Sequence, residues 1–472
     1  MNLAGGAAGR QPPRSMTIVE LSRRLASREI TSRQLVEQSL AAIADPAGEG
    51  ARAFLLVHEN SALAIADDVD RQRRQGATLP PLTGIPISIK DIFDEIGVVT
   101  LAGSKLLVGS PPAQRDSTVV ARLKNAGAVI VGRTNLTEFA YSAVGINPHY
   151  GTPRNPFDRA TGRIPGGSTS GGAISVADGM AAGAIGTDTG GSLRIPAALN
   201  GLVGFKPTAR RVPMDGLFPL APSLDSAGPI AKTVADCALL DQVLTGENSG
   251  VSAPARLRDL RFAVPTTVFQ DDLSPAVANA FRTALARLSS AGASIVEKPF
   301  LEFAQAAAVS PRGALASAEA FAFHRKWLPD RADEYDPRVL TRIRSGESVT
   351  AAQYNELLEL RRRFIRTIDD AVSDYDAMLM PTTPDTAPTI AETVRDDVSY
   401  FRINGRMLRN ASIVNLFDGC ALSVPCHDAG TAPVGLMIAG RHDTDRKLLA
   451  IGLAVEEVVR HALGASQETT AR

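Results

Sequence analysis

Two serines in glycine-rich turns are the residues of this sequence best suited to covalent chemistry. Ser168 and Ser192 each follow a Gly-Gly pair, and 24 positions (192 − 168) separate them. Between residues 164 and 200 the only ionisable side chains are Asp178, Asp188 and Arg194. Glycine pairs let the backbone adopt conformations closed to other residues and let a ligand approach the main chain closely. The segment therefore predicts a site built from hydroxyls and backbone N–H groups.

Ser192 is the candidate nucleophile, and the turn before it offers an oxyanion hole. Each well-placed N–H donor contributes about 3–4 kcal/mol to holding the oxyanion of a tetrahedral intermediate. The candidate donors are the N–H groups of Thr189, Gly190, Gly191 and Ser192. A plain glycine-rich turn between a strand and a helix has the same composition, so this alternative stays open. A phosphate loop and an α/β-hydrolase are disfavoured, because the chain lacks G-x-x-x-x-G-K-[ST] and neither serine lies in G-x-S-x-G.

The base that activates the serine has to come from elsewhere in the chain. A serine hydroxyl needs an adjacent base near neutral pH, and no histidine occurs from residue 150 to residue 323. A lysine whose pKa is lowered by burial is the remaining option. Lys90 fits because it ends the apolar segment 85–89 and so could project into the protein. The alternative for Lys90 is an ordinary surface lysine at the end of a strand.

Short apolar segments alternate with longer amphipathic ones, which predicts an α/β protein in which helices cover a mixed sheet. We expect buried strands at 85–89, 128–131, 184–186, 262–264, 377–380, 422–424 and 436–438. We expect helices at 20–25, 34–43, 61–72, 119–126, 275–291 and 351–372. Residues 16–464 read as one domain between a disordered tail at 1–15 and a second tail at 465–472. Within it, 256–397 is a variable region expected to shape the substrate pocket.

The bulk composition excludes several classes of protein. Lys+Arg and Asp+Glu both number 50, so the basic excess of a nucleic-acid binder is missing. No apolar segment reaches the roughly 18 residues of a membrane-spanning helix, and no secretory h-region is evident. Three cysteines without a C-x-x-C pair and six scattered histidines argue against disulfides and a metal site. We expect a cytoplasmic protein that needs no metal.

Several long motifs, present in one order along the chain, resemble the amidase signature family. The resemblance extends from about residue 17 to residue 462. The motifs are Gly84-Ile85-Pro86 leading to Lys90-Asp91, 132–139 (GRTNLTEF), 165–168 (PGGS), 186–196 (GTDTGGSLRIP) and 204–208 (GFKPT). The resemblance implies an α/β fold with a large, mixed and mostly parallel β-sheet that helices cover on both faces.

The resemblance also implies roles for named residues. It makes Ser192 the nucleophile, Ser168 the bridging serine after a cis peptide bond, and Lys90 the base. Thr169 replaces a serine that the family often has in this turn, so Ser170 is treated as a supporting residue. Asp188 and Arg194 are expected to pair and to fix the loop around Ser192. Ala140, Ser142 and Gly166 are expected near the substrate.

Near the C-terminal side, glutamine-using amidotransferase subunits carry an acidic residue that holds the substrate's amino group. Leu408 aligns with that position, so a glutamine site looks absent. The simple interpretation of the nearby Asn410 and Asn415 is that they cap loops or helix ends.

The sequence thus predicts a stand-alone amidase with no cofactor, which cleaves a small neutral amide, anilide or carbamate through an acyl-serine. The alternatives are a biuret- or urea-derivative hydrolase, a glutamine amidotransferase subunit, and a catalytically silent binding scaffold. A homodimer is expected, and neither nucleic acid nor a membrane is expected as a partner.

Overall fold

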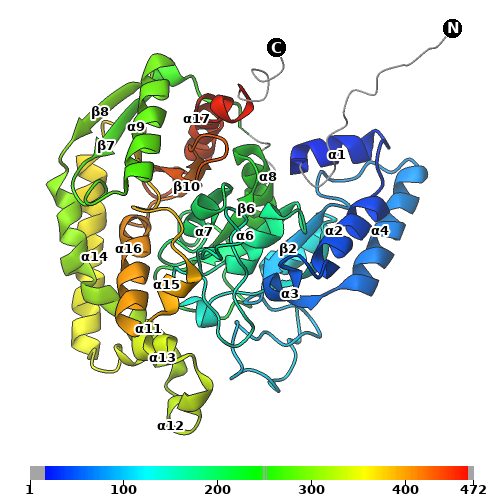
Figure 1. The fold of residues 1–472 in the computed structure, drawn as a ribbon, viewed down its shortest axis with the longest axis horizontal. Helices are drawn as coiled ribbons and strands as arrows, with labels where there is room; N and C mark the ends of the chain where they lie inside the picture. Colours follow the sequence, from blue (N-terminus) through cyan, green and yellow to red (C-terminus); the bar gives the residue numbers. More distant parts are fainter. Residues whose placement is uncertain (1–15, 248–249, 251, 466–472) are drawn as a thin grey trace.

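A computed structural model describes residues 16–247, 250 and 252–465 of the 472-residue chain. The strands in this part form a single eleven-stranded sheet in the order β1-β3-β2-β4-β6-β5-β10-β11-β9-β7-β8 (Figure 1). They are β1 (Phe54–Val57), β2 (Pro86–Lys90), β3 (Val129–Thr134), β4 (Gly183–Asp188), β5 (Val203–Lys206), β6 (Ser226–Ala231), β7 (Arg261–Pro265), β8 (Ser294–Lys298), β9 (Ala377–Pro381), β10 (Ala421–Pro425) and β11 (Gly435–Ala439).

The sheet is mixed, as expected, but it is not mostly parallel. Among the described strands, six neighbouring pairs are antiparallel and four are parallel. A parallel pair needs a crossover of about a dozen residues or more, whereas antiparallel neighbours can follow one another through a short loop. The loop 426–434 joins β10 to β11 in this way, and loop 207–225 joins β5 to β6 without a helix.

Helices pack on both faces of the sheet, which confirms that expectation. Helices α8 and α17 contact each other and lie against β6 and β10, while α6 and α7 contact β4, β5 and β11 (Figure 1). The α-helices are α1 (Ile18–Ala26), α2 (Ser32–Ala44), α3 (Gly50–Ala53), α4 (Glu59–Arg74), α5 (Thr118–Asn125), α6 (Ser170–Ala177), α7 (Arg194–Leu199), α8 (Val234–Thr245), α9 (Pro275–Ser290), α10 (Ala306–Val309), α11 (Ala314–His324), α12 (Leu328–Arg331), α13 (Pro337–Arg344), α14 (Ala351–Ala371), α15 (Ile390–Val394), α16 (Asp397–Leu416) and α17 (Asp445–Ala465).

The predicted strands all occur, with bounds within three residues of the expected ones, and each predicted helix is present. Thr31 and Gln34 form a capping box at the start of α2. The region 256–397 contributes β7, β8 and β9 to the common sheet, in addition to several helices. The expected N-terminal tail lies outside the described residues, and so does the C-terminal tail beyond residue 465.

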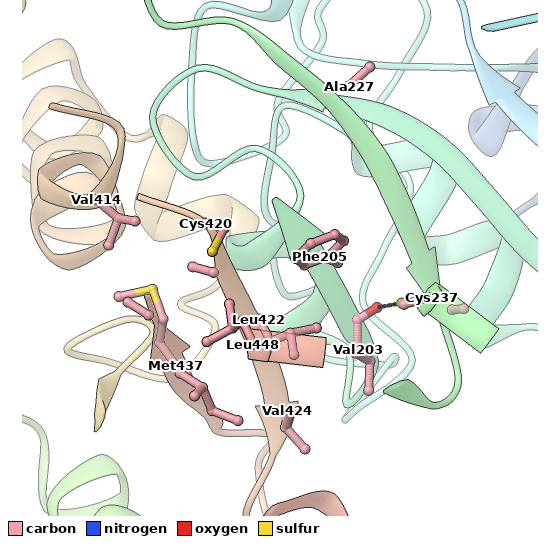
Figure 2. Close-up of a cluster of buried hydrophobic side chains, with 14 of the residues drawn as sticks. Val203, Phe205, Ala227, Cys237, Val414, Cys420, Leu422, Val424, Met437 and Leu448 are labelled. Carbon is pink, nitrogen blue, oxygen red and sulfur yellow. Dashed lines mark hydrogen bonds between the residues drawn. The ribbon is translucent and has the colours of Figure 1, made fainter. Parts of the chain in front are cut away.

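The middle of the sheet is closed by apolar side chains from several elements. Figure 2 shows Phe205 of β5 beside Leu422 of β10 and Met437 of β11, and each of these side chains is fully buried. Burying such a side chain contributes about 1.5–3 kcal/mol. This core packs β5, β10 and β11 together, and these three strands contact α7, the helix that follows Ser192.

The three cysteines contribute to this core as buried, free thiols. Cys237 of α8 donates to the carbonyl oxygen of Val203 (Figure 2), and Cys420 and Cys426 are also buried and unpaired. Burial raises the pKa of the Cys237 thiol well above its ordinary value. A buried thiol of this kind packs like a small apolar residue. No helix within the described residues has the length and hydropathy that crossing a bilayer requires.

Candidate active site

Sheet order brings the three predicted catalytic residues together. Lys90 is the last residue of β2, and β2 pairs directly with β4 in parallel. Ser192 lies in the turn between β4 and α7, and Ser168 lies just before α6. The peptide bond between Gly167 and Ser168 is cis, as the resemblance implied. Two neighbouring strand ends and one helix start therefore converge on one place.

Lys90 is fully buried, and its amino group lies among hydroxyls. Nζ donates to Ser168 Oγ at 2.8 Å and to Thr187 Oγ1 at 2.9 Å. The surface-lysine alternative is therefore wrong for this residue. Sequence reasoning missed Thr187, because the contact depends on the pairing of β4 with β2, which the sequence does not show.

Burial lowers the pKa of Lys90 from 10.5 to about 7, against the opposing charges of Asp225 and Asp188. Burial disfavours the charged form of an amine because the ammonium loses its hydration. A large fraction of Lys90 is therefore uncharged near neutral pH. An uncharged amine can accept a proton from a hydroxyl that lies within hydrogen-bonding distance.

The turns that carry Ser168 and Ser192 are in direct contact. The N–H of Thr169 donates to the carbonyl oxygen of Ser192 at 3.4 Å, and the N–H of Thr137 donates to the carbonyl oxygen of Ser168 at 3.1 Å. Ser192 Oγ has no hydrogen-bond partner among the described residues, and the residue is 6% exposed. Catalytic hydrogen bonds are often formed only once substrate is bound. The nucleophile candidate is thus buried beside Ser168 without being tied to another group.

A buried ion pair holds the turn around Ser192, as expected. Arg194 donates from Nε and Nη2 to the two oxygens of Asp188, each at 3.0 Å. Asp188 also accepts the N–H of Gly191 at 2.8 Å and that of Leu193 at 3.2 Å. Burial alone would raise the pKa of Asp188, but the charge and hydrogen bonds of Arg194 hold it at about 2. The carboxylate is therefore a permanent anchor of the backbone on both sides of Ser192.

This anchor changes the set of free donors in the candidate oxyanion hole. The N–H of Gly191 already has an acceptor in Asp188. The N–H groups of Thr189, Gly190 and Ser192 have no acceptor within the described part of the chain. These three groups are the available donors in this turn.

Asp225 holds the other side of the turn and was missed by sequence reasoning. Its carboxylate accepts the hydroxyl of Thr189 and the N–H groups of Leu220 and Ala221, at 3.0 and 3.1 Å for the two amides. In the antiparallel register Asp188 lies opposite Ser226, so the residues just beyond this pair meet. Only the pairing of β4 with β6 shows this, and β6 was not among the predicted strands.

Helix α16 completes the network, and its asparagines bind loop and strand segments rather than capping a helix end. Asn415 donates to Asp188 Oδ1 at 2.9 Å and accepts from Arg194 Nη2 at 2.7 Å. Asn410 donates to the carbonyl oxygens of Phe269 and Pro381 at 3.0 and 2.8 Å. Both side chains are buried inside a 20-residue helix, where they bind other segments and no helix end.

The substituted turn residue Thr169 is accommodated by two glycines. A Cβ placed on Gly186 would lie 2.5 Å from the Thr169 methyl carbon, and one on Gly172 would lie 2.8 Å from it. Ser170 begins α6, and its hydroxyl is buried with no hydrogen-bond partner among the described residues. Ser170 therefore makes no side-chain contact that would support Lys90 or Ser168.

The expected substrate-binding residues lie close to Ser168, but Ser142 is already hydrogen-bonded within the protein and Gly166 is tightly packed against it. The Ser142 hydroxyl donates to Asn404 at 2.9 Å and accepts from Tyr400 at 2.9 Å. Gly166 has a φ of 74°, and a Cβ there would lie 2.9 Å from Pro196. Ala140 lies two residues before Ser142, and its N–H donates to the carbonyl oxygen of Thr137 at 2.8 Å. Gly166 therefore serves close backbone packing.

One face of α16 lies over the nucleophile turn. A Cβ on Gly190 would lie 3.4 Å from the Leu408 side chain and 3.8 Å from that of Ser412, and all three residues are partly exposed. One turn earlier, Gly405 is exposed with open space around its Cα. The apolar side chain of Leu408 therefore lies next to the turn that carries Ser192. Within the described residues no group of three His, Cys, Asp or Glu side chains could hold a metal ion.

Comparisons with known proteins agree with this architecture. The sequence profile of the Amidase family matches residues 34–449. The chain is 36% identical over 456 residues to 2-amino-5-chloromuconic acid deaminase of Comamonas testosteroni, covering 95% of this chain and 97% of the relative. It is 35% identical to the A-type subunit of glutamyl-tRNA(Gln) amidotransferase from Chloroflexus aggregans, covering 94% and 96%. A crystal structure of an amidase superposes with a TM-score of 0.84 at 30% identity, covering 94% of this chain and all of the other.

Proposed function

Because this chain belongs to the amidase family and is a hydrolase of carbon–nitrogen bonds, we propose that Lys90, Ser168 and Ser192 form its catalytic triad. The observation that carries the proposal is the buried Lys90 amino group, 2.8 Å from Ser168 Oγ and with a pKa near 7. A histidine is not needed when a lysine can accept the proton in its uncharged form.

The first half of the reaction transfers the acyl group to Ser192. Ser168 gives its hydroxyl proton to Lys90 and takes the proton of Ser192, whose oxygen forms the new bond to the carbonyl carbon. The carbonyl oxygen becomes an oxyanion, which the free N–H groups of the Ser192 turn stabilise. When the C–N bond breaks, the proton held on Lys90 returns through Ser168 to the leaving nitrogen, and amine departs.

The second half regenerates the enzyme with water. Water attacks the acyl-serine ester and loses a proton through Ser168 to Lys90, so a second oxyanion forms in the same hole. When this intermediate breaks down, Ser192 leaves as the alcohol and recovers its proton by the reverse route. The net reaction converts an amide and water into an acid and an amine, with no cofactor in any step.

The proposed substrate is a small neutral amide, anilide or carbamate. The apolar Leu408 beside Gly190 supports this choice, because an α-ammonium group would need an acidic partner at this wall. A urea-derivative hydrolase and a glutamine-dependent subunit remain the alternatives. The relative from Chloroflexus aggregans is an amidotransferase A subunit. In the present chain, however, the residue next to the Ser192 turn is the apolar Leu408.

A substrate panel with the isolated chain tests the proposal. Primary amides, anilides, carbamates, ureas and glutamine are offered separately, and released amine or ammonia is measured. We expect turnover of neutral amides without any partner, and labelling of Ser192 by a fluorophosphonate in intact-mass spectra. The Ser192→Ala variant should lose both, whereas Ser170→Ala, a change at a buried serine in the adjoining turn, should keep the label. Turnover by Ser192→Ala at the wild-type rate would refute the assignment.

A further inference from the structure

A cavity lined by arginines opens on the surface of the protein, and neither Ser168 nor Ser192 is part of its lining. Its volume is about 610 Å³, which is within the roughly 300–1,000 Å³ range of small-molecule sites. The wall combines the apolar residues Ile146, Pro148, Ile390 and Val394 with Asn147, Gly151, Thr152, Arg52, Arg154 and Arg338. No acidic residue is part of this lining.

Two of the arginines share a single buried carboxylate. Arg52 and Arg154 each donate from Nε to Glu49, both at 2.7 Å, and Glu49 is fully buried. Burial would raise the pKa of Glu49, but the hydrogen bonds from Arg52 and Arg154 lower it below its usual value. The Nη groups of both guanidiniums have no acceptor among the described residues. Glu49 therefore fixes the two side chains and leaves their outer donors available.

The third arginine faces the same cavity from another element. Arg338 lies over the Tyr400 ring at 4.6 Å, and its Nε donates to Asp397 at 2.9 Å. Asp397 is mostly exposed, so water screens this pair. The three guanidiniums together exceed the charges of Glu49 and Asp397 by one positive charge.

The cavity is separated from the catalytic turn by a small apolar cluster. Ile146 and Ile390 line the cavity and belong to the cluster that also includes Ile195 and Ala411. Ile195 and Ala411 are the side chains that a Cβ on Gly191 would meet, at 2.5 and 2.7 Å. One apolar cluster therefore connects the lining of the cavity with the turn that carries Ser192.

We propose that this cavity binds a small organic acid with one carboxylate and an apolar body. Guanidinium groups bind carboxylates through paired, charge-assisted hydrogen bonds, and the Nη donors of Arg52 and Arg154 are free to form them. The apolar wall of Ile146, Ile390 and Val394 would cover the hydrocarbon part of the ligand. A fully hydrated inorganic anion would leave that wall in contact with water, so an organic carboxylate fits better. The proposal does not depend on the reaction at Ser192.

Isothermal titration calorimetry with 4-phenylbutyrate as the probe tests the site. We expect one equivalent to bind the intact protein, and we expect the uncharged analogue 4-phenylbutan-1-ol to bind at least about tenfold more weakly. Val394→Glu places a carboxylate in the cavity wall without touching Glu49. It should weaken binding by about tenfold or more, because the added carboxylate repels the carboxylate of the probe at the cavity wall.

Val398→Glu is the matched control, because it adds the same charge at a residue that is 79% exposed and does not line the cavity. It should bind the probe as the wild type does. Absence of binding at millimolar probe would overturn the proposal. So would equal affinity in the wild type and Val394→Glu, since the probe would then occupy another site, such as the catalytic one.

Discussion

Replacing Lys90 by methionine should remove the pH dependence that this lysine gives to the free energy of unfolding, so that the stability of the variant relative to the wild type falls as the pH rises. The pKa of Lys90 is about 7 in the fold and 10.5 in an unfolded chain. The difference of about 3.5 units corresponds to about 5 kcal/mol, at roughly 1.4 kcal/mol per unit. This is the free-energy cost of keeping the lysine buried at low pH, and it applies fully below pH 7.

The sign follows from proton binding. Because the folded pKa lies below the unfolded one, the unfolded chain binds more protons between pH 7 and 10.5, so the wild type gains stability as the pH rises. The advantage of Lys90→Met should therefore fall by about 2 kcal/mol between pH 7 and pH 9. Methionine also leaves the Ser168 and Thr187 hydroxyls without their partner, at a cost of about 1–3 kcal/mol each. That cost does not vary over this pH range.

Urea unfolding of both proteins at pH 7, 8 and 9 measures the effect as the pH dependence of the difference in unfolding free energy. The slope is the informative quantity, since the lost hydrogen bonds affect only the offset. Thr187→Val serves as the control, because it removes a contact of Lys90 and leaves the amine in place. A difference between Lys90→Met and wild type that stays constant from pH 7 to pH 9 would refute a lysine with a lowered pKa.

Further predictions follow from the same contacts. The rate constant kcat/KM should rise with pH through about 7, because only uncharged Lys90 accepts a proton, and a pH–rate profile flat from pH 5 to 9 would contradict this. Asp225→Asn should move the rise of kcat/KM to lower pH, because the charge of Asp225 raises the pKa of Lys90. Thr189→Val, which removes the hydrogen bond to Asp225 and keeps the charge, is the control. A rise at the same pH in Asp225→Asn and Thr189→Val would mean that Asp225 has a purely structural role. Asp236→Asn should stabilise the fold by up to about 3 kcal/mol at pH 8 and by little at pH 4. Burial raises the pKa of Asp236 to about 6, so the folded protein bears the cost of a buried carboxylate only above that pH. Equal urea midpoints of the variant and the wild type at pH 8 would count against this prediction. Gly405→Phe should raise KM for bulky amides more than for acetamide, because it fills open space on the face of α16 that also carries Leu408, and equal changes for both substrates would contradict that placement.

The sequence identified the residues that meet at the candidate site more completely than it identified the framework that positions them. The glycine pairs before Ser168 and Ser192 and the apolar segment before Lys90 can be read directly from a single sequence. The strands at 85–89 and 184–186 were visible as short apolar segments. Their order in the sheet, which places Lys90 beside the turn of Ser192, depends on pairing across the whole chain.

The residues that were missed act across large distances in the sequence. Asp225 meets Thr189 only through the antiparallel pairing of β4 with β6, and β6 reads Ser-Ala-Gly-Pro-Ile-Ala, which has little strand character. Asn415 meets Asp188 although 227 positions separate them, and its place inside a helix gives no hint of that contact. Polar residues that satisfy buried partners resemble ordinary caps until the fold is known.

The charge state of Lys90 can be measured directly by NMR of protein that carries ¹³C at the lysine ε carbons. The signal that disappears in Lys90→Met identifies this residue, and its chemical shift is followed from pH 5 to pH 11. We expect a midpoint near pH 7, well below that of an exposed lysine. A midpoint above pH 10 would mean that Lys90 stays an ammonium at neutral pH and cannot take the proton of Ser192 through Ser168.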